Sequence, residues 1–77
     1  MKQFKIMSWQ FYNSKRVDYP AEIITAESCF SAYDKLCKSK GPWVKLYCTI
    51  FEYKNDKMIN FHEVVPGVVH ETWRHRK

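Results

Sequence analysis

Glycine, proline and low-complexity sequence are scarce in this chain, so nothing divides it into separate parts. It has 77 residues with only two glycines and three prolines, and no internal repeat. A chain of this length buries about 60% of the surface that its unfolded form exposes, enough for one core and too little for two. With 45% hydrophobic and 17% aromatic residues, the composition is typical of a folded domain and not of a disordered segment.

Long apolar runs and paired cysteines are also missing. The longest apolar stretch is far below the roughly 18 residues that span a membrane, and the opening residues MKQFKIMSWQF lack the apolar block of a signal peptide. The three cysteines, Cys29, Cys37 and Cys48, are an odd number, which argues against a secreted disulfide scaffold. These absences predict a cytoplasmic protein with no membrane association.

No residue pattern typical of an enzyme occurs. The cysteines and His62, His70 and His75 show neither CxxC nor HxxxH spacing, so they do not predict a zinc site. No serine lies in a nucleophile-elbow sequence, and no glycine-rich loop could hold a nucleotide. Two of the cysteines fall on the apolar stripe of a predicted helix, where buried thiols are expected. We therefore expect no enzymatic activity, no cofactor and no metal.

Positive charge is in excess but unevenly placed. The formal net charge is +5, which favours a nucleic-acid partner. The last four residues, RHRK, hold three of the thirteen basic side chains and no acid, so residues 1–73 carry ten basic against eight acidic residues, a net charge of +2. A short cationic tail of this kind is also explained as a solubilising end.

The N-terminal part of the chain predicts a hairpin. Gln3–Tyr12 is rich in aromatic and β-favouring residues, and the polar residues 12–16 that follow are typical of a turn. The return strand, Val17–Ile24, contains Pro20, which has no backbone N–H to donate. We therefore expect this strand at an edge of the sheet.

An amphipathic helix is predicted after the hairpin. The hydroxyl of Thr25 is expected to cap its start, and Glu27 in the first turn suits the positive end of the helix dipole. Lysines cluster late in the segment, and Gly41-Pro42 ends it. The apolar stripe that would turn towards the core consists of Cys29, Ala32, Tyr33, Leu36 and Cys37.

Residues 43–53, WVKLYCTIFEY, predict a strand with two different faces. Alternation turns one set of side chains towards a core, namely Val44, Leu46, Cys48 and Ile50. The other face is aromatic rather than merely polar. It carries Trp43, Tyr47, Phe51 and Tyr53, with Lys45 and Thr49 between them.

Residues 54–57 form a predicted turn into a fourth strand, Met58–Val65. If Tyr53 pairs with Met58, alternation places Ile50 opposite Phe61, and Leu46 opposite Val65, on one face. Residues 68–77 could form a short helix, an extra strand or a frayed tail, and the i, i+4 spacing of Val69 and Trp73 favours a helical turn.

The predicted fold class is therefore α+β. The order β-β-α-β-β describes a two-layer fold in which one helix packs on one face of an antiparallel sheet. Residues 1–67 would form the single domain, followed by a basic C-terminal tail or short helix over 68–77. The expected core is Phe4, Ile6, Val44, Leu46, Cys48, Ile50, Ile59 and Phe61.

One helix covers about one face of such a sheet, which leaves the second face open. That face would show Met7, Trp9 and Phe11 of the first strand beside the rings of the third. A monomer rarely leaves so much apolar surface in water without a use. The alternative is that the C-terminal segment folds back and that Val68, Val69 and Trp73 cover these rings.

Two uses of an open aromatic face are predicted. Rings on an open sheet can stack unpaired bases at about 1–3 kcal/mol per base, while lysines contact the phosphates, as in small sheet-based RNA readers, although their glycine-aromatic signature is absent. The second use is a protein interface, because Trp, Tyr, Phe, Met and Arg are enriched at interface hot spots. Two copies could also pack face to face as a homodimer.

The opening MKQFKIMSWQFYNSKR, the short chain and the order hairpin, helix, hairpin over residues 1–65 resemble small early proteins of T-even-type phages. In size and layout the chain is similar to their antagonists of host ribonuclease toxins, the Dmd and TifA types. This resemblance implies either direct binding to a toxin, as for the Dmd type, or RNA binding, as for the TifA type. The tail WRHRK and the strand WVKLYCTIFEY favour the second.

We therefore expect an RNA-binding inhibitor of a host defence or toxin ribonuclease, acting in the host cytoplasm if phage-encoded. The alternative is a direct protein inhibitor of a host enzyme without nucleic acid. Rings would stack or anchor the partner, and basic side chains would neutralise phosphates. The predicted binding residues are Lys5, Trp9, Phe11, Lys45, Tyr47, Phe51, Arg74, Arg76 and Lys77.

Overall fold

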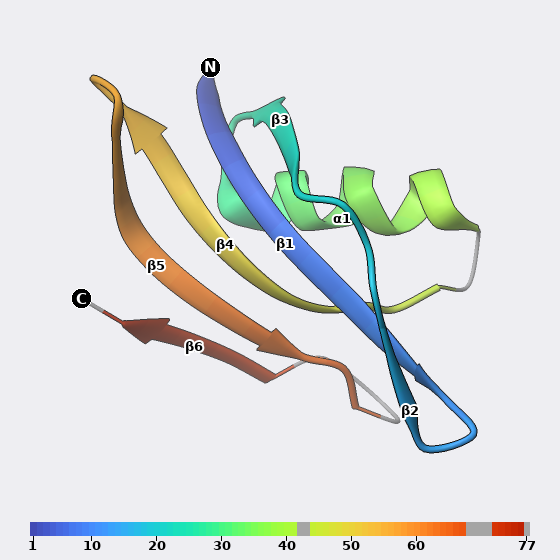
Figure 1. Ribbon diagram of the computed structural model, residues 1–77. Coiled ribbons are helices and arrows are strands. Elements are labelled where there is room, and N and C mark those ends of the chain that lie inside the picture. The colour runs from blue at the N-terminus through green and yellow to red at the C-terminus, as the bar shows by residue number, and fades with distance from the viewer. Residues whose placement is uncertain (42–43, 68–71, 77) are drawn as a thin grey trace.

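An antiparallel sheet with one helix lying across one of its faces makes up the described part of the chain (Figure 1). The computed structural model describes residues 1–41, 44–67 and 72–76, with only the backbone for residues 75 and 76. The elements are β1 (Lys2–Tyr12), β2 (Lys15–Asp18), β3 (Glu22–Ala26), α1 (Cys29–Lys40), β4 (Tyr47–Lys54), β5 (Lys57–Val65) and β6 (Thr72–Arg76). The α+β class is confirmed. The predicted order β-β-α-β-β is not confirmed, because three strands, β1, β2 and β3, precede the helix and three, β4, β5 and β6, follow it.

The expected second strand is split in two at Pro20. The sheet order is β2-β1-β4-β5-β6, and β3 pairs with the same edge of β1 as β2 does. Between β2 and β3, one backbone hydrogen bond joins the chain to β1, from the Tyr19 amide to the Ser8 carbonyl oxygen at 2.9 Å. Because proline cannot donate to a ladder, the break falls there, and the predicted edge position is confirmed.

The helix begins later than Thr25. Its N-cap is Ser28, whose hydroxyl oxygen accepts a hydrogen bond from the Ser31 amide at 3.2 Å. Thr25 is not the cap because β3 continues to Ala26 and pairs Thr25 with Gln3 of β1. The predicted stripe is confirmed, with four residues buried and Cys29 partly so. At the other end, the Gly41 amide donates to the Cys37 carbonyl oxygen at 3.2 Å.

The core lies between α1 and the sheet. Its buried members include the predicted aliphatic residues of β1 and β4, and Val44 packs against them from the preceding segment. The Tyr33 hydroxyl donates to the Leu46 carbonyl oxygen at 3.0 Å and accepts from the Leu46 amide at 3.2 Å. This pair of hydrogen bonds fixes the chain where it enters β4.

A bulge in β5 overturns part of the predicted register. Tyr53 pairs with Met58 as expected, but Ile50 pairs with His62 and not with Phe61. The extra residue is accommodated near Asn60, which has a left-handed φ of 49°. Val64 is therefore buried instead of Val65, and the predicted core positions Ile59 and Phe61 are wrong. Ile59 is 37% exposed, and Phe61 stacks on Phe51 on the other face.

The C-terminal residues extend the sheet. Residues 72–76 form β6 along the outer side of β5, so Trp73 does not lie in the expected helical turn (Figure 1). Trp73 pairs with Val64 and therefore faces the helix, where its ring centroid lies 4.4 Å from Phe30 and 5.4 Å from Tyr33. Val68 and Val69 are outside the described residues. Of the three residues expected to fold back over the rings, Trp73 turns the other way.

Candidate binding face of the sheet

The sheet face opposite α1, called the open face here, gathers rings from three neighbouring strands. Cross-strand pairing puts Trp9 beside Tyr47, and Lys5 beside Phe51, because directly opposed residues of an antiparallel pair point to the same side. The open face comprises Gln3, Lys5, Met7, Trp9, Phe11, Arg16, Asp18, Ile23, Thr25, Tyr47, Thr49, Phe51, Tyr53, Met58, Phe61, Glu63 and Arg74.

The first ring cluster consists of Trp9, Phe11 and Tyr47. The Trp9 and Tyr47 rings are nearly parallel, 18° apart with centroids separated by 6.2 Å, and Phe11 meets Tyr47 edge-on at 5.2 Å. The guanidinium carbon of Arg16 lies 4.2 Å from the centre of the Trp9 ring. Such contacts hold each ring in place at about 0.5–1.5 kcal/mol per pair, and Phe11 remains half exposed.

The second ring pair consists of Phe51 of β4 and Phe61 of β5. Their centroids are 4.8 Å apart and their planes 19° apart, an offset stack. The sequence prediction missed Phe61 because it counted β5 as a regular strand. The available signal was Asn60, a residue type that tolerates left-handed backbone, standing between two apolar residues.

Charged side chains lie among the rings. The described side chains of the open face include three basic residues, Lys5, Arg16 and Arg74, and two acidic residues, Asp18 and Glu63, a net charge of +1. The Arg16 Nε atom lies 2.8 Å from an Asp18 carboxylate oxygen, and Glu63 stands opposite Arg74 across the β5 and β6 strands. The face is thus aromatic and only mildly cationic.

The structure brings together five of the nine predicted binding residues. Lys5, Trp9, Phe11, Tyr47 and Phe51 share the open face. Arg74 lies on the same side but in β6, two strands away from β4.

The remaining predicted residues are placed less directly. Lys45 precedes β4 and is exposed, and its carbonyl oxygen accepts a hydrogen bond from Gln10 at 3.4 Å. The backbone of Arg76 pairs with Phe61, but its side chain is not described. Lys77 lies outside the described residues. Besides Phe61, the sequence prediction missed Arg16, which the hairpin returns to the face beside Trp9.

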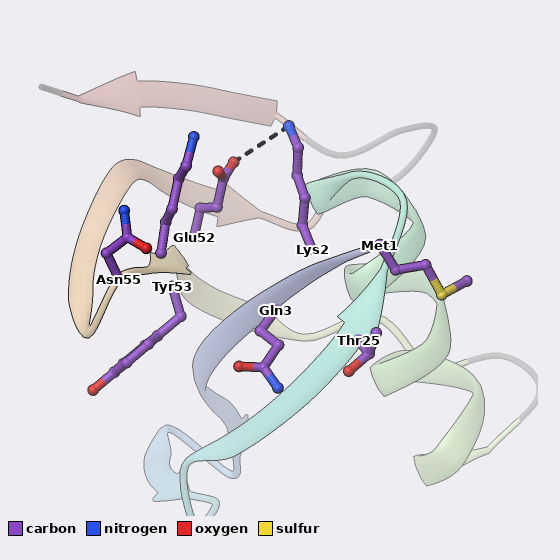
Figure 2. Close-up of a pocket in the computed structure, with 8 residues that line it drawn as sticks. Met1, Lys2, Gln3, Thr25, Glu52, Tyr53 and Asn55 are labelled. Atoms are coloured by element: carbon purple, nitrogen blue, oxygen red, sulfur yellow. Dashed lines mark ion pairs between the residues drawn. The ribbon is translucent and has the colours of Figure 1, made fainter.

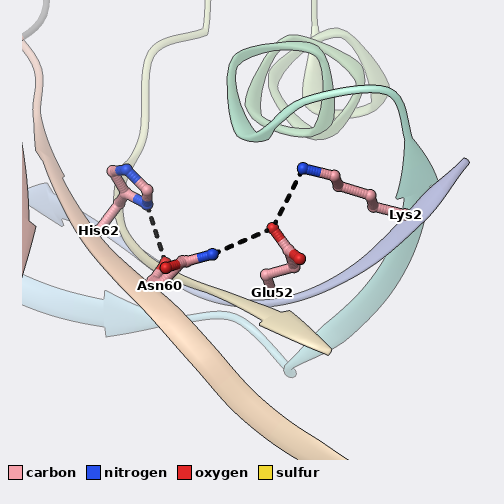
Figure 3. A network of polar contacts seen from close by, with 4 residues as sticks. All are labelled: Lys2, Glu52, Asn60 and His62. Atoms are coloured by element: carbon pink, nitrogen blue, oxygen red, sulfur yellow. Dashed lines mark hydrogen bonds and ion pairs between the residues drawn. The ribbon is translucent and has the colours of Figure 1, made fainter. Parts of the chain in front are cut away.

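A second polar feature lies at the end of the sheet near the N-terminus. Figure 2 shows the hollow there, where Lys2 reaches the buried Glu52 carboxylate at 3.5 Å. The side-chain amide of Asn60 also donates to this carboxylate at 3.4 Å, and the backbone carbonyl oxygen of Asn60 lies 2.9 Å from His62 Nδ1. Figure 3 shows these contacts. These contacts satisfy Glu52 and brace the β5 bulge, so they have a structural explanation.

The thiol nearest to this network is a weak candidate for chemistry. Cys29 lines the hollow between Glu52 and the start of α1. Burial raises the pKa of the Cys29 thiol, which keeps it protonated and lowers its nucleophilicity at neutral pH. Among the described residues, no group of three or more His, Cys, Asp or Glu side chains is arranged to hold a metal ion. The open face is accordingly the candidate site.

In comparisons with known proteins, no family model, no curated protein and no solved structure matches this chain. Within the described residues, no helix has both the length and the apolar content needed to cross a membrane.

Proposed function

We propose that this protein binds single-stranded RNA on the open face of its sheet. The observation that carries the proposal is that two groups of rings, Trp9, Phe11 and Tyr47, and Phe51 with Phe61, lie opposite the helix without a covering element in the described structure. Every base has a π-face, so such rings bind single strands by stacking, whereas a duplex keeps its bases stacked inside.

The rings differ in how much surface they offer. Phe11 is 50% exposed and lies at the rim of the first ring cluster, while the other rings of the face are partly buried by their neighbours. A base added to Phe11 buries apolar surface without displacing any contact of Tyr47. We therefore assign to Phe11 the largest single contribution to stacking.

The basic side chains are placed to contact the backbone of the bound strand. Lys5 stands opposite Phe51, and Arg16 lies against Trp9, so each ring group has a cation beside it. Exposed cations next to a bound strand neutralise phosphates and release counterions. Arg74 extends the same side to the outer strand β6.

The biological role that we propose for RNA binding is inhibition of a host defence or toxin ribonuclease. It rests on the resemblance in chain length and in the opening residues to small phage proteins, among them antagonists of such enzymes. A chain of 77 residues with its rings on one face can inhibit such an enzyme by binding its RNA substrate, or the surface where enzyme and RNA meet, without catalysing a reaction.

Anisotropy of a fluorescently labelled single-stranded RNA decamer, measured from 50 to 200 mM salt, tests RNA binding. If two or three cations contact phosphates, log affinity falls against log salt with a slope of roughly −1.5 to −2. Phe11→Ala should weaken binding at least fivefold, since a lost stack costs about 1–3 kcal/mol. The matched control is Phe30→Ala, because Phe30 is 59% exposed but belongs to α1, on the other side of the sheet. Equal affinities of the two variants, or no binding at 50 mM salt, would contradict the proposal.

A protein partner is the second candidate, and the balance of charge on the open face favours it. The open face combines many rings with a net charge of only +1, and this composition is more typical of a protein-binding hot spot than of a phosphate-binding surface. In this case a host enzyme, or a second copy of the chain, stays bound after nuclease treatment and is released by Tyr47→Ala. Under the RNA proposal, nuclease treatment itself removes the partner.

A further inference from the structure

The break between β2 and β3 leaves a hollow on the open face. β2 pairs with β1 at residues 9–12, and β3 pairs with β1 at residues 2–6. Between these two ladders, the described backbone hydrogen bond to this edge of β1 is the one from the Tyr19 amide. The hollow measures about 500 Å³, and its lining includes Met7, Trp9, Arg16, Asp18 and Thr49. It therefore adjoins the first ring cluster and extends it towards the sheet edge.

The hollow combines a flat platform with a carboxylate. The Arg16 guanidinium lies 4.2 Å above the Trp9 ring, and its Nε atom is held by one Asp18 oxygen at 2.8 Å. Asp18 stands directly opposite Trp9 in the strand pair, so its carboxylate is beside this stack. Bases stack on arginine planes as well as on aromatic rings. A base stacked on the Arg16 guanidinium would point its hydrogen-bonding edge towards the Asp18 carboxylate.

The carboxylate determines which base fits. An ionised carboxylate only accepts hydrogen bonds, through two oxygens with about four lone-pair sites, and Arg16 uses one of them. The described side-chain contact of Asp18 is with Arg16, so its remaining lone-pair sites can accept hydrogen bonds from the edge of a base. Guanine has two adjacent donors on its pairing edge, N1–H and the N2 amino group, which match two carboxylate oxygens. Adenine, cytosine and uracil each present a single donor group on that edge.

We propose that the hollow at the β2–β3 break is a guanine-binding subsite, in which the base stacks on Arg16 over Trp9 and donates N1–H and N2–H to Asp18. The inference rests on the proposed RNA binding and adds base selectivity to it. The first ring cluster and the second ring pair then bind neighbouring nucleotides without preference, because stacking alone is tolerant of sequence.

Single-stranded uridine hexamers that carry G, inosine, A or C at one central position test the subsite with the intact protein. The guanine hexamer should bind about tenfold more tightly than the all-uridine hexamer, the size expected of one bidentate base contact. Inosine lacks the N2 amino group and should lose most of this gain. Asp18→Asn replaces one acceptor by a donor, and it should reduce the preference for guanine to within about twofold while all-uridine binding persists.

Asp56→Asn is the matched control, because Asp56 lies in the β4–β5 turn outside the hollow and its left-handed φ of 60° suits asparagine. It should retain the guanine preference. Equal binding of all hexamers, or a guanine preference that survives in Asp18→Asn, would overturn the subsite and leave RNA binding intact. Failure of every hexamer to bind would overturn the proposed function together with the subsite.

Discussion

The two faces of the sheet are made by the same strands but consist of different kinds of side chain. In β4, Cys48 and Ile50 point to the helix and are almost fully buried, whereas Tyr47 and Phe51 point the other way and keep part of their rings in water. In β1, Ile6 is buried against α1 in the same manner. Aliphatic residues thus dominate the covered face and aromatic residues the open one.

The difference shows how a very small protein separates stability from binding. Aliphatic side chains interlock between sheet and helix, and their burial drives folding. Rings whose centroids lie 4.8 to 6.2 Å apart are positioned by their neighbours and remain partly exposed. Because strand residues alternate in direction, a change on one face leaves the other in place.

The largest effect that tests this separation is expected in β4. Ile50→Ala should lower the free energy of unfolding by about 3 kcal/mol, because it leaves a cavity between sheet and helix. Phe51→Ala removes a larger side chain, but it should cost only about 1 kcal/mol, mainly the stack on Phe61. Urea titration followed by circular dichroism measures both.

Ile50→Val keeps this comparison usable if the alanine variant does not fold, since it should cost about 0.5–1.5 kcal/mol. A loss for Phe51→Ala that equals or exceeds the loss for Ile50→Ala would mean that the open face belongs to the core. The stability of the fold would then not be separable from the surface proposed for binding.

The regular parts of this architecture could be predicted from sequence, and the irregular parts could not. Alternation is unbroken in residues 44–53 and in β1, so both faces of β4 and five of the candidate site residues, three of them in β1, were found. The β5 bulge requires one extra residue at Asn60, which reverses the direction of every later side chain, so Phe61 was assigned to the wrong face. The two-residue turn at Asn13-Ser14 places Arg16 and Asp18 on the open face, the split at Pro20 decides where β3 resumes pairing with β1, and local propensity shows neither.

An alkaline limit to stability is expected from the covered face. Burial raises the pKa of the Cys48 thiol, helped by the neighbouring Cys37, and burial also raises the pKa of the Tyr33 hydroxyl. Above about pH 9 the unfolded chain releases the Cys48 proton while the folded chain retains it, so the free energy of unfolding falls as pH rises. The loss should approach about 1.4 kcal/mol per pH unit for each such group.

Thermal unfolding at pH 8, 9 and 10 measures this loss. Cys48→Ala should be less stable than the wild type at pH 8 but should lose less stability between pH 9 and pH 10, because groups such as Tyr33 and Cys29, whose pKa burial also raises, still contribute to the loss. Phe51 has no ionisable group, so the stability of Phe51→Ala should fall with pH at the wild-type slope. If Cys48→Ala also keeps that slope, the thiol is not the titrating group.

The smallest effect concerns a polar side chain on the covered face. Ser8 is 2% exposed and pairs with Cys48, and its Oγ atom has no hydrogen-bond partner in the described structure. A buried hydroxyl without a partner costs its desolvation, so Ser8→Ala should raise the free energy of unfolding by about 1 kcal/mol. Thr49→Val, a hydroxyl removal on the open face, should change it by less than about 0.5 kcal/mol. A loss of stability in Ser8→Ala would contradict this prediction and show that the hydroxyl makes a stabilising contact, for which the adjoining hollow at the β2–β3 break is the place.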